Sequence, residues 1–211
     1  MLLRDKALSK QEQDKLTPLK VLQDFIEGNA RFIRDEVHSI DHKALISQTT
    51  ESQHPKAIVL SCIDSRVPVE LIFDQTIGDV FVARIAGNFE NIDILGSIEY
   101  SCKVAGSKLV FVLGHESCGA IKAACDHLEL GNLTSMLANI NPAVTLTQTQ
   151  IKGKHDSSNA EFVEKTIENN VMLTINRIRE KSPILKEMED NQEIKIVGGV
   201  YHISTGKVSL L

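Results

Sequence analysis

Two short motifs in this sequence contain residue types that bind transition metals. Residues 62–66 (CIDSR) carry a thiol, a carboxylate and a guanidinium at alternate positions, and residues 115–119 (HESCG) carry an imidazole and a thiol three residues apart. Two thiolates and an imidazole are soft and borderline ligands that suit Zn²⁺ in a tetrahedral site. The sequence therefore predicts a zinc site formed by Cys62, His115 and Cys118.

Asp64 and Arg66 follow Cys62 by two and four residues. A carboxylate paired with a guanidinium keeps a fixed orientation and stays ionised, so Asp64 can accept a hydrogen bond from water on a neighbouring metal. In a closed state, in which Arg66 releases it, Asp64 is also a candidate fourth ligand. Three strong ligands leave the fourth position exchangeable, which is typical of catalytic rather than structural zinc.

Each of these residues also has an ordinary structural explanation. Isolated cysteines are often small buried hydrophobic residues, and an isolated histidine is often a hydrogen-bonded core residue. The Asp-Ser-Arg segment alone can be a solvated turn with a surface ion pair of little energetic value. The three candidate ligands taken together, each at the end of an apolar run, favour the metal site.

The elements that position the motifs are two apolar runs, residues 57–61 (AIVLS) and 108–113 (KLVFVL). Runs of this kind, bounded by polar residues, are typical of strands buried on both faces of a parallel sheet. Cys62 and His115 follow these runs. Both are therefore expected at the carboxyl edge of the sheet, where open α/β sheets form their binding sites.

Strands and helices alternate along the rest of the chain. Further strands are expected at residues 79–85 and in a hairpin at 193–209, and the segment 141–159 is expected to be a polar surface loop. Helices are expected at residues 17–33, 43–49, 68–72, 92–105, 117–130, 160–181 and 183–188.

This alternation predicts an α/β fold with right-handed crossovers. We expect a parallel sheet of about four strands with helices on both faces, plus a C-terminal strand and an N-terminal helical arm. Residues 1–16 are polar and lack periodicity, so they are expected to form a flexible segment or a helix that needs a partner to become ordered. Residues 17–211 are expected to form one domain.

Composition limits the partners. The chain has 211 residues with 23 basic and 28 acidic side chains, a net charge of −5, which argues against a nucleic-acid partner. Its charged N-terminus is unlike a signal peptide and no apolar segment is long enough to span a bilayer, so we expect a cytoplasmic protein without a membrane partner. Four cysteines suit metal binding in a reducing compartment better than a disulfide framework.

The two metal-binding motifs resemble those of the β-class carbonic anhydrases. The likeness extends to residues 84–88 (RIAGN), similar to the family's RNAGN turn, to residues 97–100 (SIEY), similar to its S-x-E-Y helix, and to residues 198–206, similar to its closing G-x-V-Y-D hairpin. It covers roughly Thr17 to the C-terminus. Ile85 departs from the family's Asn, so any hydrogen bond which that Asn makes is missing here.

The resemblance implies a zinc lyase that hydrates carbon dioxide to bicarbonate and a proton. In this chain, Cys62, His115 and Cys118 would be the zinc ligands, and Asp64 with Arg66 would be the catalytic pair. The resemblance also implies self-association as a dimer or tetramer, with active sites at a subunit interface and an N-terminal arm that embraces the partner.

Four residues match the family's substrate pocket. Gln53 matches a glutamine that reaches the pocket from the adjacent subunit, Phe81 and Tyr100 match its aromatic residues, and Gly119 would supply an N–H near the metal. Phe81 and Tyr100 can equally be core residues, and Gln53 a surface amide. Val59 stands where family members that close Asp onto zinc have tryptophan, so we expect the open state here.

Two other functions remain open. The first is a non-catalytic zinc-binding scaffold or bicarbonate sensor of the same fold, with Asp64 completing the coordination shell. The second is a redox protein that uses Cys62 and Cys118, which is disfavoured because no C-x-x-C pair begins a helix. The sequence also predicts an obligate dimer, because little chain precedes the helix at 17–33 to cover its apolar stripe.

Overall fold

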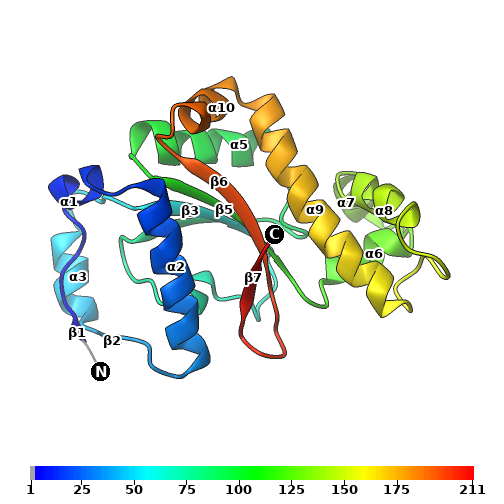
Figure 1. Ribbon diagram of the computed structural model, residues 1–211, viewed down its shortest axis with the longest axis horizontal. Helices are drawn as coiled ribbons and strands as arrows, with labels where there is room; N and C mark the ends of the chain where they lie inside the picture. Colours follow the sequence, from blue (N-terminus) through cyan, green and yellow to red (C-terminus); the bar gives the residue numbers. More distant parts are fainter. Residues whose placement is uncertain (1–2) are drawn as a thin grey trace.

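The computed structural model describes residues 3–211. Figure 1 labels the elements where there is room. One helical segment of the described residues, η1, is a π-helix. The elements in chain order are β1 (Leu3–Arg4), α1 (Lys10–Asp14), α2 (Pro18–Ile33), β2 (Ser39–Ile40), α3 (His42–Gln48), β3 (Ala57–Ser61), α4 (Val69–Ile72), β4 (Val80–Arg84), α5 (Ile92–Glu99), η1 (Tyr100–Val104), β5 (Leu109–His115), α6 (Gly119–Cys125), α7 (Gly131–Leu137), α8 (Asn141–Gln148), α9 (Ala160–Lys181), α10 (Pro183–Asp190), β6 (Lys195–Tyr201) and β7 (Val208–Leu210).

The main sheet has five strands in the order β4-β3-β5-β6-β7. The first four run parallel and β7 pairs antiparallel with β6. In Figure 1, α9 runs alongside β6, while α6, α7 and α8 gather at one end of the molecule. The predicted α/β class, with four parallel strands and an added C-terminal strand, is confirmed.

Alternate side chains of β3 and β5 face opposite helical layers. Ile58 and Val110 belong to a core cluster with residues of α5, α9 and α10. Ala57 and Leu109 belong to a second cluster, with residues of α2 and α4. Because both faces are covered, both strands are apolar throughout, and the polar residues that end them come out at the sheet edge.

Helix α2 begins as the sequence predicts and packs on its own sheet. The Thr17 hydroxyl accepts the Lys20 N–H, and Pro18 occupies the first turn. Phe25 stacks on Phe73 at a centroid distance of 4.6 Å. Phe25 and Asn29 of the apolar stripe that the sequence assigns to a partner subunit are therefore covered by the same chain, whereas Ile26 and Ile33 stay exposed, by 42% and 46%. Cover of these two residues by a partner subunit stays a prediction.

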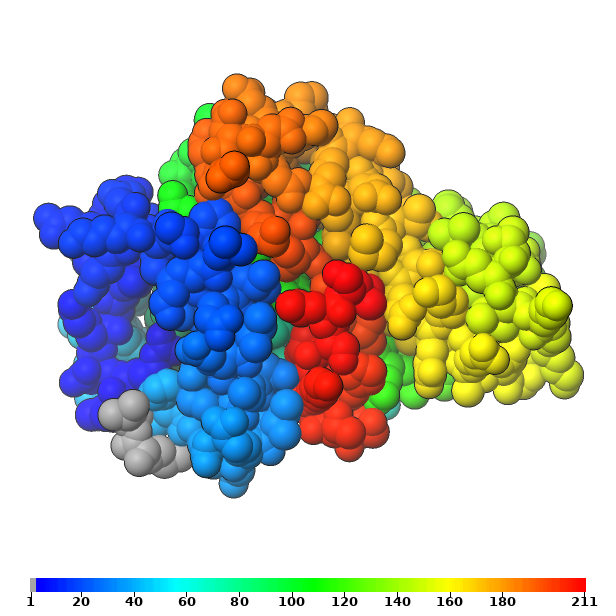
Figure 2. All heavy atoms as spheres, in the orientation of Figure 1, coloured from blue at the N-terminus to red at the C-terminus, as the bar shows by residue number. Residues whose placement is uncertain are grey.

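The C-terminal hairpin lies beside α2. Figure 2 shows the two segments side by side on one face of the molecule. The buried Asn29 amide donates to the Gly206 carbonyl at 2.9 Å, and its oxygen accepts the Val208 N–H at 2.8 Å. Helix α2 thus holds the hairpin in place from one side.

Residues 3–16 make more contacts than the flexible segment expected from the sequence. Strand β1 pairs with β2, and Ser9 caps α1. The buried Gln13 side chain donates to the carbonyls of Pro55 and Ala105, each at 2.8 Å. A single amide that joins two distant carbonyls leaves no periodic apolar pattern, so the sequence did not indicate this attachment.

The segment 141–159, predicted as a polar loop, begins with helix α8. Ala143, Val144 and Thr147 form its buried face. The Thr147 hydroxyl accepts a hydrogen bond from Asn169 of α9 at 2.9 Å. Helix α6 is also shorter than predicted and ends at Cys125, after which His127 has a positive φ of 52°.

Two features bear on the expected cellular setting. In the part of the chain that the structure describes, no helix combines the length and the apolar composition needed to cross a bilayer. All four cysteines are free and buried. The thiols are therefore available as metal ligands or core residues rather than as disulfide partners.

Candidate metal centre

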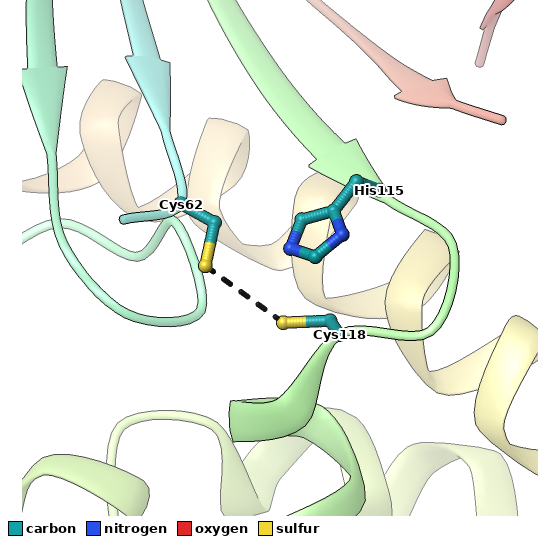
Figure 3. Close-up of side chains that lie close together, drawn as sticks. All are labelled: Cys62, His115 and Cys118. Atoms are coloured by element: carbon teal, nitrogen blue, oxygen red, sulfur yellow. Dashed lines mark hydrogen bonds between the residues drawn. The ribbon is translucent and has the colours of Figure 1, made fainter. Parts of the chain in front are cut away.

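The candidate metal centre lies at the carboxyl edge of β3 and β5. Cys62 follows β3, His115 ends β5 and Cys118 precedes α6, and Figure 3 shows their side chains converging. One ligand atom from each residue lies within 4.8 Å of the other two, and the two Sγ atoms are 4.0 Å apart. All three residues are buried. The structure thus brings together the three ligands predicted from the sequence.

The His115 ring is oriented by a backbone carbonyl. Its Nδ1 lies 2.8 Å from the carbonyl oxygen of Glu116. A carbonyl can only accept, so Nδ1 carries the proton and Nε2 presents a lone pair. Nε2 is buried without a hydrogen-bond partner among residues 3–211. A buried, unpaired imidazole nitrogen beside two thiols fits a metal ligand, because leaving it unpaired costs free energy.

The two thiols interact electrostatically. A hydrogen bond from Cys118 lowers the pKa of Cys62 to about 4, and the same contact with Cys62 raises the pKa of Cys118. The Gly87 N–H also points at the Cys62 sulfur, 3.4 Å away. The metal-free pair therefore shares one proton, which a metal ion would displace, because ligating thiols must be deprotonated.

Asp64 and Arg66 form the predicted pair beside the ligands. Arg66 Nε and Nη2 donate to the two carboxylate oxygens at 3.0 and 2.8 Å. This hydrogen bonding lowers the pKa of Asp64 to about 2. The Asp64 Oδ2 lies 3.9 Å from His115 Nε2. Asp64 therefore stays ionised at the edge of the ligand group, with both oxygens engaged by Arg66.

Arg84 fixes the turn that carries Cys62 and Asp64. Its Nε donates to the Cys62 carbonyl at 2.9 Å and its Nη2 to the Asp64 carbonyl at 2.6 Å. The sequence indicated the RIAGN turn but gave Arg84 no role, because backbone acceptors leave no signal in a sequence. In the same turn, Gly87 has φ +81°, and a Cβ there would lie 2.5 Å from Ile140 Cδ1. Only glycine fits this position.

Two of the predicted substrate-pocket residues, Phe81 and Tyr100, lie together at β4, back along the sheet from the candidate metal ligands. The rings of Phe81 and Tyr100 meet edge-on, with their centroids 6.2 Å apart. Together with Ile58 they line an open cavity of about 760 Å³. Phe81 pairs with Ile58, four residues before Cys62, which is about 13 Å along an extended strand. Gln53 is exposed and precedes Cys62 by nine residues.

Gly119, the fourth predicted pocket residue, does lie next to a ligand. It is the first residue of α6 and directly follows Cys118. A Cβ added to Gly119 would meet no other atom within 4 Å. Within one chain, Phe81 therefore lies back along the sheet from the candidate ligands, with Tyr100 beside it, whereas Gly119 directly follows Cys118.

Comparison with known proteins agrees with this geometry. The chain matches the family model for carbonic anhydrase over residues 57–208. Carbonic anhydrase 2 of Mycobacterium tuberculosis is 34% identical over 193 residues, which cover 87% of this chain and 88% of that protein. Residues 57–208 include both candidate metal-binding motifs and the four parallel strands β3 to β6.

Solved structures show the same fold. The β-carbonic anhydrase CafA of Aspergillus fumigatus superposes with a TM-score of 0.70 at 26% identity, over 90% of this chain and 88% of that one. A tetrameric β-carbonic anhydrase of Sordaria macrospora superposes with a TM-score of 0.72 at 21% identity, over 90% of this chain and 96% of that one.

Proposed function

Because this chain belongs to the β-carbonic anhydrase family, we propose that it binds zinc and reversibly hydrates carbon dioxide to bicarbonate and a proton. The observation that carries the proposal is the buried convergence of Cys62, His115 and Cys118, with His115 Nε2 unpaired and facing the thiols. These three side chains would hold the zinc ion. When bound, zinc would supply Lewis-acid activation of water for attack on carbon dioxide.

Asp64 and Arg66 are proposed to orient the reacting water. Asp64 is a hydrogen-bond acceptor that stays ionised, and Arg66 and Arg84 fix the positions of its carboxylate and its carbonyl. The two thiolates would neutralise the charge of a bound zinc ion, so this centre would acidify water less than three neutral histidines would. An ionised acceptor held in one orientation compensates for that weaker activation.

We also propose that a second copy of the chain completes the substrate pocket. Phe81 pairs with Ile58, four residues before Cys62 along β3, Tyr100 lies beside Phe81, and Gln53 precedes β3. Ile92 and Tyr100, beside the open edge of β4, are exposed, Ile92 by 84%. The tetrameric relatives of Sordaria macrospora, whose fold this chain shares, support self-association. The active unit would then be a dimer or a tetramer.

The proposed setting is the cytoplasm. Four free thiols, two of them in the metal centre, suit a reducing compartment in which cysteines remain available as ligands. The substrate is the small molecule carbon dioxide, or bicarbonate in the reverse direction.

The proposal is tested by stopped-flow carbon dioxide hydration with parallel zinc analysis. The purified wild type should carry one zinc per chain and hydrate carbon dioxide, and Cys62→Ser should lose both properties. Cys125→Ser is the matched control, because Cys125 is buried but lies outside the ligand group. Stoichiometric zinc without hydration would instead support the non-catalytic scaffold, and absence of zinc binding would refute the metal assignment.

A further inference from the structure

Glu116, which lies between the two ligands of the HESCG motif, is clamped by the C-terminal hairpin. His202 Nδ1 contacts Glu116 Oε1 at 2.9 Å. Ser204 donates to Glu116 Oε2 through its backbone N–H at 3.1 Å and its hydroxyl at 3.0 Å. Both carboxylate oxygens are therefore held by residues that follow β6.

The backbone of Glu116 connects this clamp to the metal centre. Its N–H donates to the Tyr201 carbonyl at 2.9 Å, and its carbonyl accepts the His115 Nδ1 proton at 2.8 Å. The carbonyl that fixes the tautomer of His115 thus belongs to a residue anchored at both its N–H and its side chain. If Glu116 moved, the Nδ1 proton of His115 would lose its acceptor. The proton could then move to Nε2, which would no longer offer a lone pair to a metal.

The next residue gives a reason for so firm an anchor. Ser117 has φ +54°, a left-handed conformation that costs a residue other than glycine roughly 1 kcal/mol or more. Such backbone conformations persist only where surrounding contacts hold them. Because Ser117 directly precedes Cys118, relaxation of this residue would also displace the second ligand of the motif.

The hairpin that forms the clamp is itself fixed. His202 Nε2 contacts the Ser209 hydroxyl at 3.0 Å, and the His202 N–H donates to the Lys207 carbonyl at 2.8 Å. On the other side, Asn29 of α2 bonds to the turn at Gly206 and to the start of β7 at Val208. The clamp is thus attached to the folded body rather than to a free loop.

We propose that Glu116 and His202 are positioning residues for the metal centre. The carboxylate, held by His202 and Ser204, fixes the carbonyl that orients His115 and holds the strained turn that presents Cys118. The inference rests on the proposed function in that the metal is zinc. It goes further by assigning the orientation of two ligands to the C-terminal hairpin.

The first test measures zinc release to a colorimetric chelator from the zinc-loaded protein. Glu116→Ala and His202→Ala should release zinc about 10- to 100-fold faster than wild type. They should also shift the visible bands of the cobalt-substituted protein. His202→Asn, whose amide can donate as Nδ1 does, should restore release to within about threefold of wild type.

The control is Glu189→Ala. This substitution also removes a carboxylate that accepts two bonds from Arg179 and one from the Ile196 N–H. Glu189 lies on α10, outside the metal centre. It should cost stability without changing zinc release or the cobalt spectrum. If Glu116→Ala and His202→Ala match Glu189→Ala in both readouts, the positioning role is refuted.

A second test works on the metal-free protein and separates this inference from the proposed function. Nitrogen-15 shifts of the His115 ring should report the Nδ1–H tautomer in wild type and in Glu189→Ala, and a mixture of tautomers in Glu116→Ala. A tautomer change in a protein that binds no zinc would support the clamp and refute the proposed function. A wild-type tautomer in Glu116→Ala would refute the clamp even where zinc binds.

Discussion

The Asp64 carboxylate and the Arg66 guanidinium face each other in a two-pronged ion pair at the edge of the metal centre. The Arg66 N–H also donates to Asp64 Oδ1, at 2.9 Å, so three bonds set the direction of one carboxylate. Oδ2 nevertheless lies only 3.9 Å from His115 Nε2. The closed state that the sequence leaves possible would need Arg66 to release this carboxylate to the candidate ligand group.

Replacement of Arg66 tests the value of this geometry. A lysine keeps the charge but cannot form two parallel bonds, so the carboxylate loses its fixed direction. Arg66→Lys should lower kcat/KM for carbon dioxide hydration by about 100-fold with zinc content unchanged. Arg34→Lys, which changes an exposed pair with Glu36, is the control and should be neutral. Equal kcat/KM in both variants would exclude an orienting role for Arg66.

Removal of a ligand tests the metal centre directly. His115→Ala leaves two thiols and no imidazole, so zinc affinity should fall by more than the roughly 10- to 100-fold typical of residues that only support a ligand. Zinc content after dialysis against a weak chelator is the measurement. Cys102→Ser, at a buried thiol outside the ligand group, should retain zinc. Full zinc retention in His115→Ala would end the assignment.

The features that could be predicted from the sequence are those that depend on residue type and spacing within a short segment. The apolar runs of β3 and β5 predicted the strands, and Cys62, His115 and Cys118 predicted the centre, because ligand chemistry is carried by residue type. Contacts made through backbone atoms were missed. Arg84 holds two carbonyls and Gln13 joins two others. Acceptors of this kind occur at every residue, so no motif distinguishes them.

The close contact between α2 and the end of α4 allows a stability test. A Cβ on Gly28 would lie 1.9 Å from the Phe73 carbonyl oxygen, whereas one on Gly96 would meet nothing within 4 Å. Gly28→Ala should therefore destabilise the fold by about 1–3 kcal/mol through overpacking. Gly96→Ala, inside a helix, should be neutral or stabilising by up to about 1 kcal/mol. Urea unfolding measures both, and a stabilising Gly28→Ala would contradict this packing.

Asp74 links the N-terminal elements and predicts a pH dependence of stability. Burial alone would raise the pKa of Asp74, but hydrogen bonds from Arg31 Nε at 2.6 Å, from the His38 N–H at 3.1 Å and from the His38 ring outweigh it and lower the pKa. Because the pKa of Asp74 is lower in the folded protein, its ionised carboxylate stabilises the fold at pH values above the pKa of the unfolded chain, near 3.9. This stabilisation is lost as the pH falls through the lower pKa of the folded protein.

Substitution of Asp74 isolates this contribution. Asp74→Asn should cost about 2 kcal/mol at pH 7, because charged hydrogen bonds are lost. The difference from wild type should shrink as pH falls below about 4, because the Asp74 carboxylate binds a proton in the unfolded state there before it does so in the folded state. Urea unfolding of the metal-free proteins between pH 7 and 3 is the measurement. Asp190→Asn is the control, because Asp190 forms an exposed ion pair with Lys186. Its effect on the free energy of unfolding should stay near zero over the whole pH range. A constant Asp74→Asn penalty would show that the effect is steric.

Subunit mixing tests whether two chains build each active site. One variant, Cys62→Ser, lacks a ligand but keeps the aromatic pair, and a second, Phe81→Ala with Tyr100→Ala, lacks the pair but keeps the ligands. Each should be nearly inactive alone. If the pocket comes from the partner, a mixed dimer contains one site with intact ligands and an intact pocket.

Co-expression of the two variants should then restore about one quarter of wild-type activity, because half of randomly assembled dimers are mixed and each has one complete site. The structure motivates this outcome, since Phe81 pairs with Ile58 rather than with a residue near Cys62. Stopped-flow carbon dioxide hydration and light scattering give the activity and the assembly state. An inactive mixture that contains mixed dimers would mean that each chain builds its own pocket, and that Phe81 and Tyr100 serve only its packing.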